Sequence, residues 1–241
     1  MFRDRIEAGQ RLAEHLLHLE GQDVVVLGLP RGGVPVAHEV AMFLGTPLDV
    51  IVVRKLGVPF QPELAMGAIS EEGVRIIDSN LVAIAGVSDE ELAEVETRER
   101  AELESRARLY RDGRPRESLE GRVAVIVDDG IATGSTARAA AQVARRLGAD
   151  RVVVATPVAP REVEARLRRD ADEVVVAETP YPFYAIGQFY LDFSQTADAE
   201  VIAALDRGES KAGADTSRPR KEPETSQPGT PERHTRHGPR H

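Results

Sequence analysis

Apolar positions along the chain follow two alternating patterns. Short continuous runs of β-branched and other apolar residues are typical of strands covered on both faces, and they occur at 23–29, 48–53, 74–77, 123–127, 152–155 and 173–177. Between them, apolar residues recur at helical spacing over 5–19, 35–44, 89–110, 135–147, 161–169 and 198–205. Strands that alternate with helices predict an α/β fold with a doubly wound, mostly parallel sheet.

The span from about 68 to 120 interrupts this alternation. It contains a short strand and a long charged helix, which the capping box from Ser88 to Glu91 opens. Arginines and glutamates interleave along the helix, namely Arg98, Arg100, Arg106, Arg108 and Arg111 with Glu96, Glu99, Glu102 and Glu104. We expect a solvated face with ion pairs four residues apart, although the arginines also suit an anionic substrate or another subunit.

Composition narrows the class of protein. The chain has 241 residues, 41% of them hydrophobic, and no cysteine, so it can bury one sizeable core without disulfides or thiolate metal sites. Mixed charges at the N-terminus and the lack of a long apolar stretch predict a cytoplasmic protein with no membrane segment. A net charge of −9 argues against nucleic acid as a partner. Polar, proline-rich composition predicts a disordered tail at 208–241, after a single domain at 1–207.

The segment 123–136 carries the most specific chemistry. An apolar strand ends in Asp128 and Asp129, at the edge where open α/β sheets bind ligands. The small-residue loop Ala132, Thr133, Gly134, Ser135 and Thr136 follows and opens a helix. Free N–H groups and the positive dipole end of that helix can hold a phosphate without a lysine. A plain turn capped by one aspartate is the alternative, but it explains neither the second acid nor the glycines.

This motif resembles the 5-phosphoribosyl-1-pyrophosphate (PRPP) signature of the type I phosphoribosyltransferases. The resemblance implies that Asp128 and Asp129 bind the ribose hydroxyls and organise Mg2+, directly or through water. It implies further that residues 132–136 bind the 5-phosphate. In this family a hood outside the core completes the site, and we expect it from the insert at 68–120 and from 178–194.

Two further segments suit the pyrophosphate group. The first predicted strand runs into a loop with Arg31, Gly32 and Gly33, whose backbone N–H groups can form an anion nest. By position it resembles the pyrophosphate loop of the family, which often contains a strained or cis peptide. The second predicted strand delivers Arg54 and Lys55 to the same edge, where they can stabilise the charge of departing pyrophosphate. Ordinary packing glycines and surface ion pairs are the alternatives.

Aromatic residues gather where an acceptor could bind. Six of the ten aromatic residues fall within 13 positions: Tyr181, Phe183, Tyr184, Phe189, Tyr190 and Phe193. Tyr181 and Phe183 are the candidates to stack on a flat base, and core packing or a dimer contact is the alternative. Guanine and hypoxanthine enzymes of the family carry an aspartate where this chain has Ala132, so that acceptor class is disfavoured.

The resemblance implies an enzyme that binds Mg·PRPP and transfers the phosphoribosyl group to a nitrogen-containing acceptor, with a nucleobase as the first expectation. Arg31, Lys55, Asp128 and Asp129 are the expected catalytic residues. Two other functions stay open, a non-catalytic regulator that senses PRPP or a nucleotide on the same fold, and a nucleotide or sugar-phosphate hydrolase. A homodimer is also expected, since members of the family often dimerise.

Overall fold

The apolar runs of the sequence form a five-stranded parallel sheet. The computed structural model describes residues 1–71, 73–111 and 113–212, and its sheet has the order β2-β1-β6-β7-β8. These strands are β2 (Leu48–Val50), β1 (Val24–Gly28), β6 (Val123–Val127), β7 (Arg151–Val158) and β8 (Glu173–Glu178). β6 pairs with β1 on one side and β7 on the other, so its carboxyl end lies at the centre of one edge.

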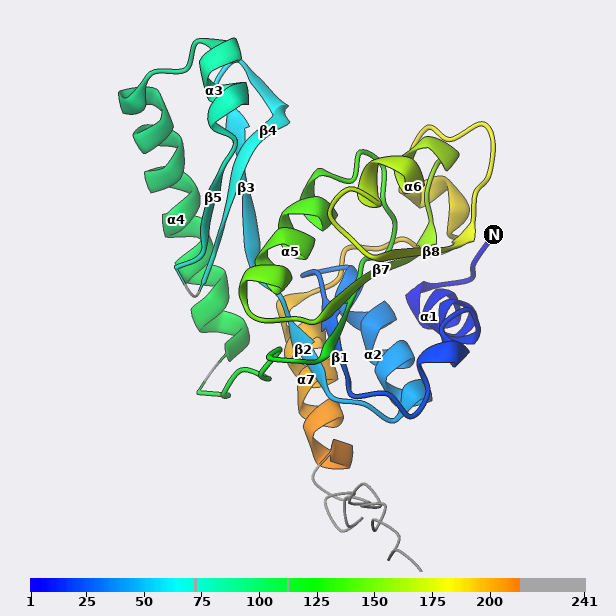
Figure 1. Ribbon diagram of the computed structural model, residues 1–241. Coiled ribbons are helices and arrows are strands. Elements are labelled where there is room, and N and C mark those ends of the chain that lie inside the picture. Colours follow the sequence, from blue (N-terminus) through cyan, green and yellow to red (C-terminus); the bar gives the residue numbers. More distant parts are fainter. Residues whose placement is uncertain (72, 112, 213–241) are drawn as a thin grey trace, which may run out of the picture.

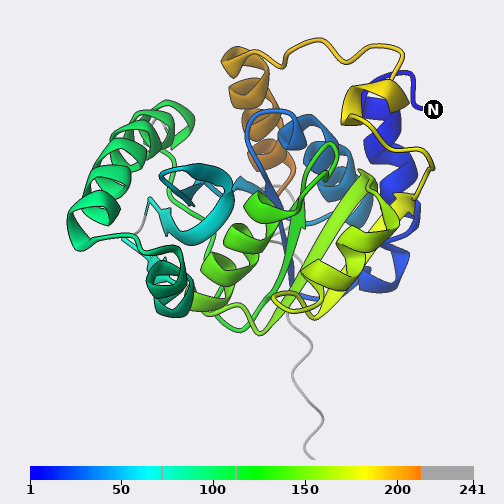
Figure 2. The same cartoon turned by 90° about the horizontal axis from the view of Figure 1, so that it is seen from above.

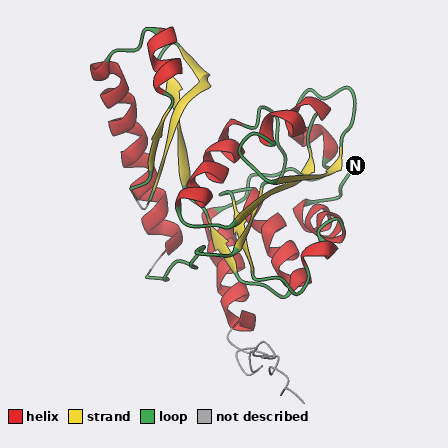
Figure 3. Cartoon of the chain, in the orientation of Figure 1, coloured by secondary structure: helices red, strands yellow, loops and turns green. Residues whose placement is uncertain are grey.

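Helices cover both faces of this sheet (Figures 2 and 3). The first face packs against α1 (Arg5–Glu14), α2 (Gly33–Leu44) and α7 (Asp198–Ala212), and the second against α5 (Ser135–Arg146) and α6 (Arg161–Leu167). Successive side chains of a strand point to opposite faces of the sheet, so each strand contributes to two hydrophobic cores. Val26 and Val125 belong to the core on the first face, and Val25 and Ala124 belong to the core on the second. Short 3-10 helices lie at η1 (Leu17–Leu19) and η2 (Ile186–Phe189). The predicted doubly wound α/β fold is confirmed.

A second layer stands beside the sheet (Figure 1). Its antiparallel sheet has the order β3-β4-β5, from β3 (Val53–Val58), β4 (Gln61–Ser70) and β5 (Arg75–Ile77). α3 (Ser79–Ala85) follows, and α4 (Asp89–Arg111) covers the side of the sheet away from α5.

The predicted strand at 48–53 is confirmed only over residues 48–50. Only β2 (Leu48–Val50) belongs to the main sheet, and the chain leaves it before β3 begins at Val53. Residues 58–67, which include Pro59 and Pro62, belong to the hairpin that β3 and β4 form. The two prolines fit there because they lie at the exposed tip and at the frayed start of β4, outside the regular ladder. The interruption therefore begins near Val53, before residue 68.

The long helix α4 shows the expected charged face. Its capping box forms, because the Glu91 N–H donates to Ser88 Oγ over 3.2 Å and the Ser88 N–H donates to Glu91 Oε2 over 2.9 Å. Ion pairs four residues apart join Arg100 to Glu96, Arg106 to Glu102 and Arg108 to Glu104. These arginines are therefore paired along the helix surface.

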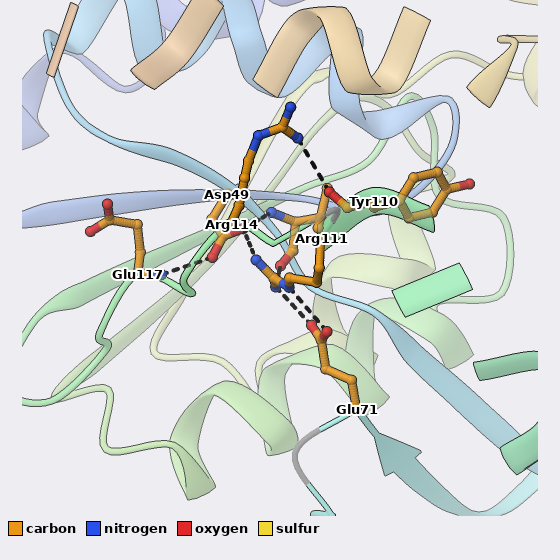
Figure 4. A network of polar contacts seen from close by, with 7 residues as sticks. Asp49, Glu71, Tyr110, Arg111, Arg114 and Glu117 are labelled. Carbon is orange, nitrogen blue, oxygen red and sulfur yellow. Dashed lines mark hydrogen bonds and ion pairs between the residues drawn. The ribbon is translucent and has the colours of Figure 1, made fainter. Parts of the chain in front are cut away.

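Arg111, at the end of α4, departs from that pattern and ties the second layer to the main sheet (Figure 4). Its guanidinium donates to Asp49 of β2, to the Val50 carbonyl over 3.0 Å and to Glu71 over 2.7 Å. Asp49 also accepts from the Glu117 N–H over 3.0 Å. Burial raises the pKa of Asp49, and the charge of Arg111 opposes that rise. A buried carboxylate thus fixes where α4 and the β4–β5 turn sit.

α7 extends to Ala212, so the first residues of the predicted tail are helical. The remainder of that tail, 213–241, lies outside the described residues.

The Arg111 network makes a prediction for stability. Arg111→Gln leaves Asp49 buried without its cation, so we expect a loss of about 3–5 kcal/mol at pH 7 in denaturant unfolding. The folded variant would bind a proton at Asp49 more tightly than the unfolded chain does. Its stability therefore falls as pH rises through the raised pKa, and the deficit against wild type shrinks at pH 5.

Arg108→Gln is the matched control on the same helix. Its partner Glu104 lies 4.0 Å away and both side chains are exposed, so we expect a change within about 0.5 kcal/mol. Equal losses in the two variants would show that the Arg111 network does not hold the layers together.

Candidate active site

The two carboxylates that follow β6 lie at the centre of the carboxyl edge of the sheet. β6 delivers them there because it runs parallel to β1 and β7 and ends beside them. Asp129 is buried, and its N–H donates to Asp128 Oδ1 over 2.9 Å. Asp128 forms no ion pair with any residue in the described ranges. The edge therefore presents one carboxyl without a cation and one that is paired.

The partner of Asp129 is Arg5, which opens α1. Arg5 Nε donates to Asp129 Oδ2 over 2.8 Å, and only 13% of the Arg5 side chain is exposed. The guanidinium also donates to the Ser194 carbonyl over 2.7 Å and stacks 4.3 Å from the centroid of the Phe193 ring. Sequence analysis assigned no role to Arg5, because a contact across 124 positions leaves no local pattern.

The two carboxyls differ in their affinity for protons. Burial raises the pKa of Asp128 well above its usual range, and the neighbouring charge of Asp129 raises it further. Burial also raises the pKa of Asp129, but the hydrogen bond and charge of Arg5 act against that rise. Asp129 is thus favoured as the ionised member of the pair and Asp128 as the member that binds a proton.

The loop after β1 packs directly on these carboxylates. A Cβ atom added to Gly32 would lie 2.0 Å from Asp129 Oδ2, and one added to Gly33 would lie 2.5 Å from the Val127 carbonyl oxygen. Only glycine fits this contact. The peptide between Pro30 and Arg31 is cis, as the family resemblance implies. Arg31 is half-buried, and its side chain forms no hydrogen bond or ion pair with the described residues.

The predicted phosphate loop leaves the start of α5 open. Gly134 precedes the helix at φ +82° and has no side chain to cap it, and the Ser135 N–H donates to Thr133 Oγ1 over a long 3.5 Å. Ala132, Thr133 and Thr136 are exposed, and Ser135 is half-buried. The hydroxyl groups of this loop and the dipole of the first turn therefore lie at the surface, as an anion site requires.

A cavity of about 530 Å³ joins this loop to the second layer. Pro30, Arg54, Lys55 and Thr136 line it together with acidic residues of α4. Arg54 and Lys55 come from β3 and not, as predicted, from the end of a strand of the main sheet. Arg54 Nε donates to Glu99 over 2.8 Å, and Lys55 Nζ to Glu63 over 3.2 Å. Both cations border the site, but carboxylates neutralise them.

The aromatic segment lies across the same edge, with Tyr190 as its anchor. The Tyr190 hydroxyl donates to the Asp129 carbonyl over 2.5 Å, and burial raises its pKa so that it stays protonated. Phe183 packs on Phe189 with ring centroids 5.1 Å apart. Tyr181 is 94% exposed. The structure thus places the Tyr190 hydroxyl on the backbone of Asp129 and leaves Tyr181, a predicted acceptor residue, at the surface.

The donor set suits Mg2+ only in part. Both acids offer oxygen ligands, and Mg2+ commonly takes one or two carboxylates and fills its remaining positions with water and substrate phosphates. Among the described residues, no group of three or more His, Cys, Asp or Glu side chains is placed to hold a metal on its own. The site therefore fits a cation that arrives with a phosphate ligand.

In the part of the chain that the structure describes, no helix combines the length and the apolar character that a membrane span needs.

Comparisons with known proteins agree with this geometry. A family model described as "Phosphoribosyl transferase domain" matches residues 4–194. "Putative phosphoribosyl transferase MT0597" of Mycobacterium tuberculosis (strain CDC 1551 / Oshkosh) is 56% identical over 207 residues, which cover 86% of this chain and 47% of the relative. The chain thus spans about half the length of the curated relatives it matches.

A solved structure is also similar, the crystal structure of TT1426 from Thermus thermophilus. It is 46% identical, with a TM-score of 0.78, and the match covers 85% of this chain and 97% of that one.

The contact at Gly32 can be tested directly. Gly32 has φ −61°, which alanine tolerates, so Gly32→Ala should fold while its methyl group displaces the Asp129 carboxylate from Arg5. We expect at least about a tenfold loss of PRPP affinity by calorimetric titration, since one charged contact is worth about 1.5–3 kcal/mol.

Gly21→Ala is the control for this variant. Gly21 lies at φ +78° with open space around its Cα, so the substitution strains the backbone away from the site. It should lower the melting temperature but leave PRPP affinity unchanged. Unchanged affinity in Gly32→Ala would show that the loop contact does not shape the ligand site.

Proposed function

The chain belongs to the phosphoribosyl transferase domain family, and we propose that it binds Mg·PRPP at the carboxyl edge of β6 and transfers the phosphoribosyl group to a nitrogen-containing acceptor, with a nucleobase as the first expectation. The observation that carries this proposal is the direct packing of the Gly32–Gly33 loop on Asp128 and Asp129. It joins two separate anion loops and a carboxylate pair into one site, which neither a strand-to-helix turn nor a single phosphate site requires.

The 5-phosphate end of PRPP fits the open start of α5. Residues 132–136 provide exposed hydroxyls and backbone N–H groups, and the dipole of α5 favours a dianion there. The ribose hydroxyls would then lie near Asp128 and Asp129, which come immediately before this loop in the chain.

The pyrophosphate end fits the loop after β1. Arg31, Gly32 and Gly33 offer backbone donors and one guanidinium, while Arg54 and Lys55 border the neighbouring cavity. Arg54 and Lys55 can bind pyrophosphate only when it replaces Glu99 and Glu63 as their partner. This exchange would turn both cations from partners within the second layer toward the ligand.

Asp128 and Asp129 would hold Mg2+, directly or through water. When bound, the cation would neutralise the charge that grows on pyrophosphate as it leaves. Arg5 would keep the Asp129 carboxylate ionised and oriented through its 2.8 Å hydrogen bond.

The reaction we propose is a substitution at C1′ of the ribose. The acceptor nitrogen forms a bond to C1′ with its lone pair, the C1′–O bond breaks with inversion, and pyrophosphate leaves with that electron pair. The acceptor nitrogen then gives its proton to solvent or to a base. Positioning by the phosphate loop and charge stabilisation by Arg31 and Lys55 are the contributions we assign to this chain.

We assign acceptor binding to the segment 178–194, with Tyr181 and Phe183 as the stacking residues. The exposure of Tyr181 means that an acceptor would have to be covered by movement of this segment. The same proposal includes a single domain at 1–207 with a hood at 68–120 and 178–194. It also includes a cytoplasmic location and a homodimer.

A second candidate function has one observation in its favour. Arg5 forms an ion pair with Asp129, and Arg54 and Lys55 form ion pairs with glutamates. These charged groups of the site are therefore neutralised within the chain. A regulator that senses PRPP or a nucleotide without turnover can use such a site. Release of pyrophosphate from PRPP in the presence of a panel of nucleobases and amines would distinguish the enzyme from the sensor.

Titration with PRPP in the presence and absence of Mg2+ tests the donor site. Wild type should bind PRPP with strong dependence on Mg2+. Asp128→Asn and Asp129→Asn should each lose about 1–3 kcal/mol of binding free energy, since each removes a buried charged contact.

Asp150→Asn is the control, because Asp150 is exposed and lies beside the first residue of β7, at the opposite edge of the sheet. It should bind PRPP as wild type does. Circular dichroism of each variant would confirm folding. Equal PRPP affinity in wild type and in folded Asp128→Asn and Asp129→Asn would remove the assignment.

A further inference from the structure

A second charged cavity lies at the edge of the sheet opposite to Asp128 and Asp129. Its volume is about 420 Å³, and its lining includes the charged residues Arg145, Arg146, Arg168, Arg169, Asp170 and Asp172. The arginines come from the ends of α5 and α6, and the two aspartates precede β8. The phosphate loop starts α5 and this cavity lies at its end, so the 12 residues of the helix separate them by about 18 Å.

We propose that this cavity is a binding site for a small organic polyphosphate, such as a nucleoside triphosphate, separate from the PRPP site. The charge of its lining is the first argument. Four arginines against two aspartates give a formal charge of +2 in a chain whose net charge is −9. An anion approaching this protein is thus attracted here, against the overall charge.

Neighbouring groups already satisfy both carboxylates of the cavity. Asp170 accepts from Arg138 over 2.5 Å and from the Gln142 amide over 2.6 Å. Asp172 accepts from Arg145 over 2.5 Å and from the Val152 N–H over 2.7 Å. Neither acid therefore needs the remaining arginines as partners.

Two arginines remain without an anion. Arg168 pairs with Glu164 over 2.7 Å, but the side chains of Arg146 and Arg169 form no hydrogen bond or ion pair within residues 1–71, 73–111 and 113–212. A favourable interaction with a helix C-terminus explains one arginine at each helix end. Arg146 and Arg169 are both solvent-exposed, so their guanidinium groups are open to an anion that enters the cavity.

The size and lining of the cavity indicate the class of ligand. Small-molecule sites have volumes of about 300–1,000 Å³, which includes this one. A guanidinium group can donate two parallel hydrogen bonds to the oxygens of a phosphate. Ile76 of β5 adds an apolar wall against which an attached organic group can pack. Nucleic acid fits less well, because it requires a basic track along the surface and this chain is acidic overall.

Calorimetric titration without Mg2+ tests this site, with inorganic triphosphate and ATP as the probes. The full chain is compared with Arg146→Gln/Arg169→Gln and with the control Arg3→Gln/Arg108→Gln, which removes two exposed charges elsewhere. We expect the first double variant to lose at least about tenfold in affinity for both probes, while the control binds as wild type does. Hydrogen exchange should show protection at 143–149 and 167–172 on binding.

Measuring PRPP affinity in the same variants distinguishes failure of this proposal from failure of the proposed function. Arg146→Gln/Arg169→Gln should retain Mg2+-dependent PRPP affinity, and Asp129→Asn should retain this ATP binding whether or not the PRPP proposal holds. Equal ATP and triphosphate affinities in wild type and Arg146→Gln/Arg169→Gln would overturn the proposal. Tighter binding of a single-stranded decanucleotide than of ATP, lost in the same double variant, would overturn it in favour of nucleic acid.

Discussion

The contact between the β1–α2 loop and the Asp128–Asp129 pair is the constraint on which the rest of the site depends. Parallel strands bring both segments to one edge, but only the missing side chains of Gly32 and Gly33 allow them to touch. Pro30, which precedes the cis peptide, and Thr136 at the start of α5 border one cavity, and the carboxylates lie against the two glycines. The parallel strands bring the loop and the carboxylates to the same edge of the sheet, and the two glycines allow the loop and the carboxylates to come into contact.

Charge balance shapes this site as much as geometry does. The chain is acidic, and two of the cations near the ligand edge are paired with carboxylates, Arg5 with Asp129 and Lys55 with Glu63. The donors that remain open are backbone N–H groups at α5 and the loop around Arg31. Under the proposed function, this site would hold an anion through dipoles and would exchange its internal ion pairs when the ligand brings its own charge. The second layer, fixed by Arg111 on Asp49, positions the cations that take part in this exchange.

The sequence predicted the parts of this protein that are encoded locally. The run of β6, its two acids and the glycine-containing loop lie within 14 positions, so strand, site and helix could be inferred together. The β3–β4 hairpin could not, because Pro59 and Pro62 resemble loop punctuation although they lie at its tip. Arg5 and Tyr190 reach Asp129 from opposite ends of the chain, and only the folded structure brings them together.

A crystal structure of the protein with Mg2+ and PRPP tests the central claim most directly. We expect the 5-phosphate on the N–H groups of 132–136, the ribose hydroxyls beside Asp128 and Asp129, and pyrophosphate on the Arg31–Gly33 loop. Lys55 should have left Glu63 for the pyrophosphate. PRPP bound instead in the cavity of Arg146 and Arg169, with the β6 edge empty, would contradict the account.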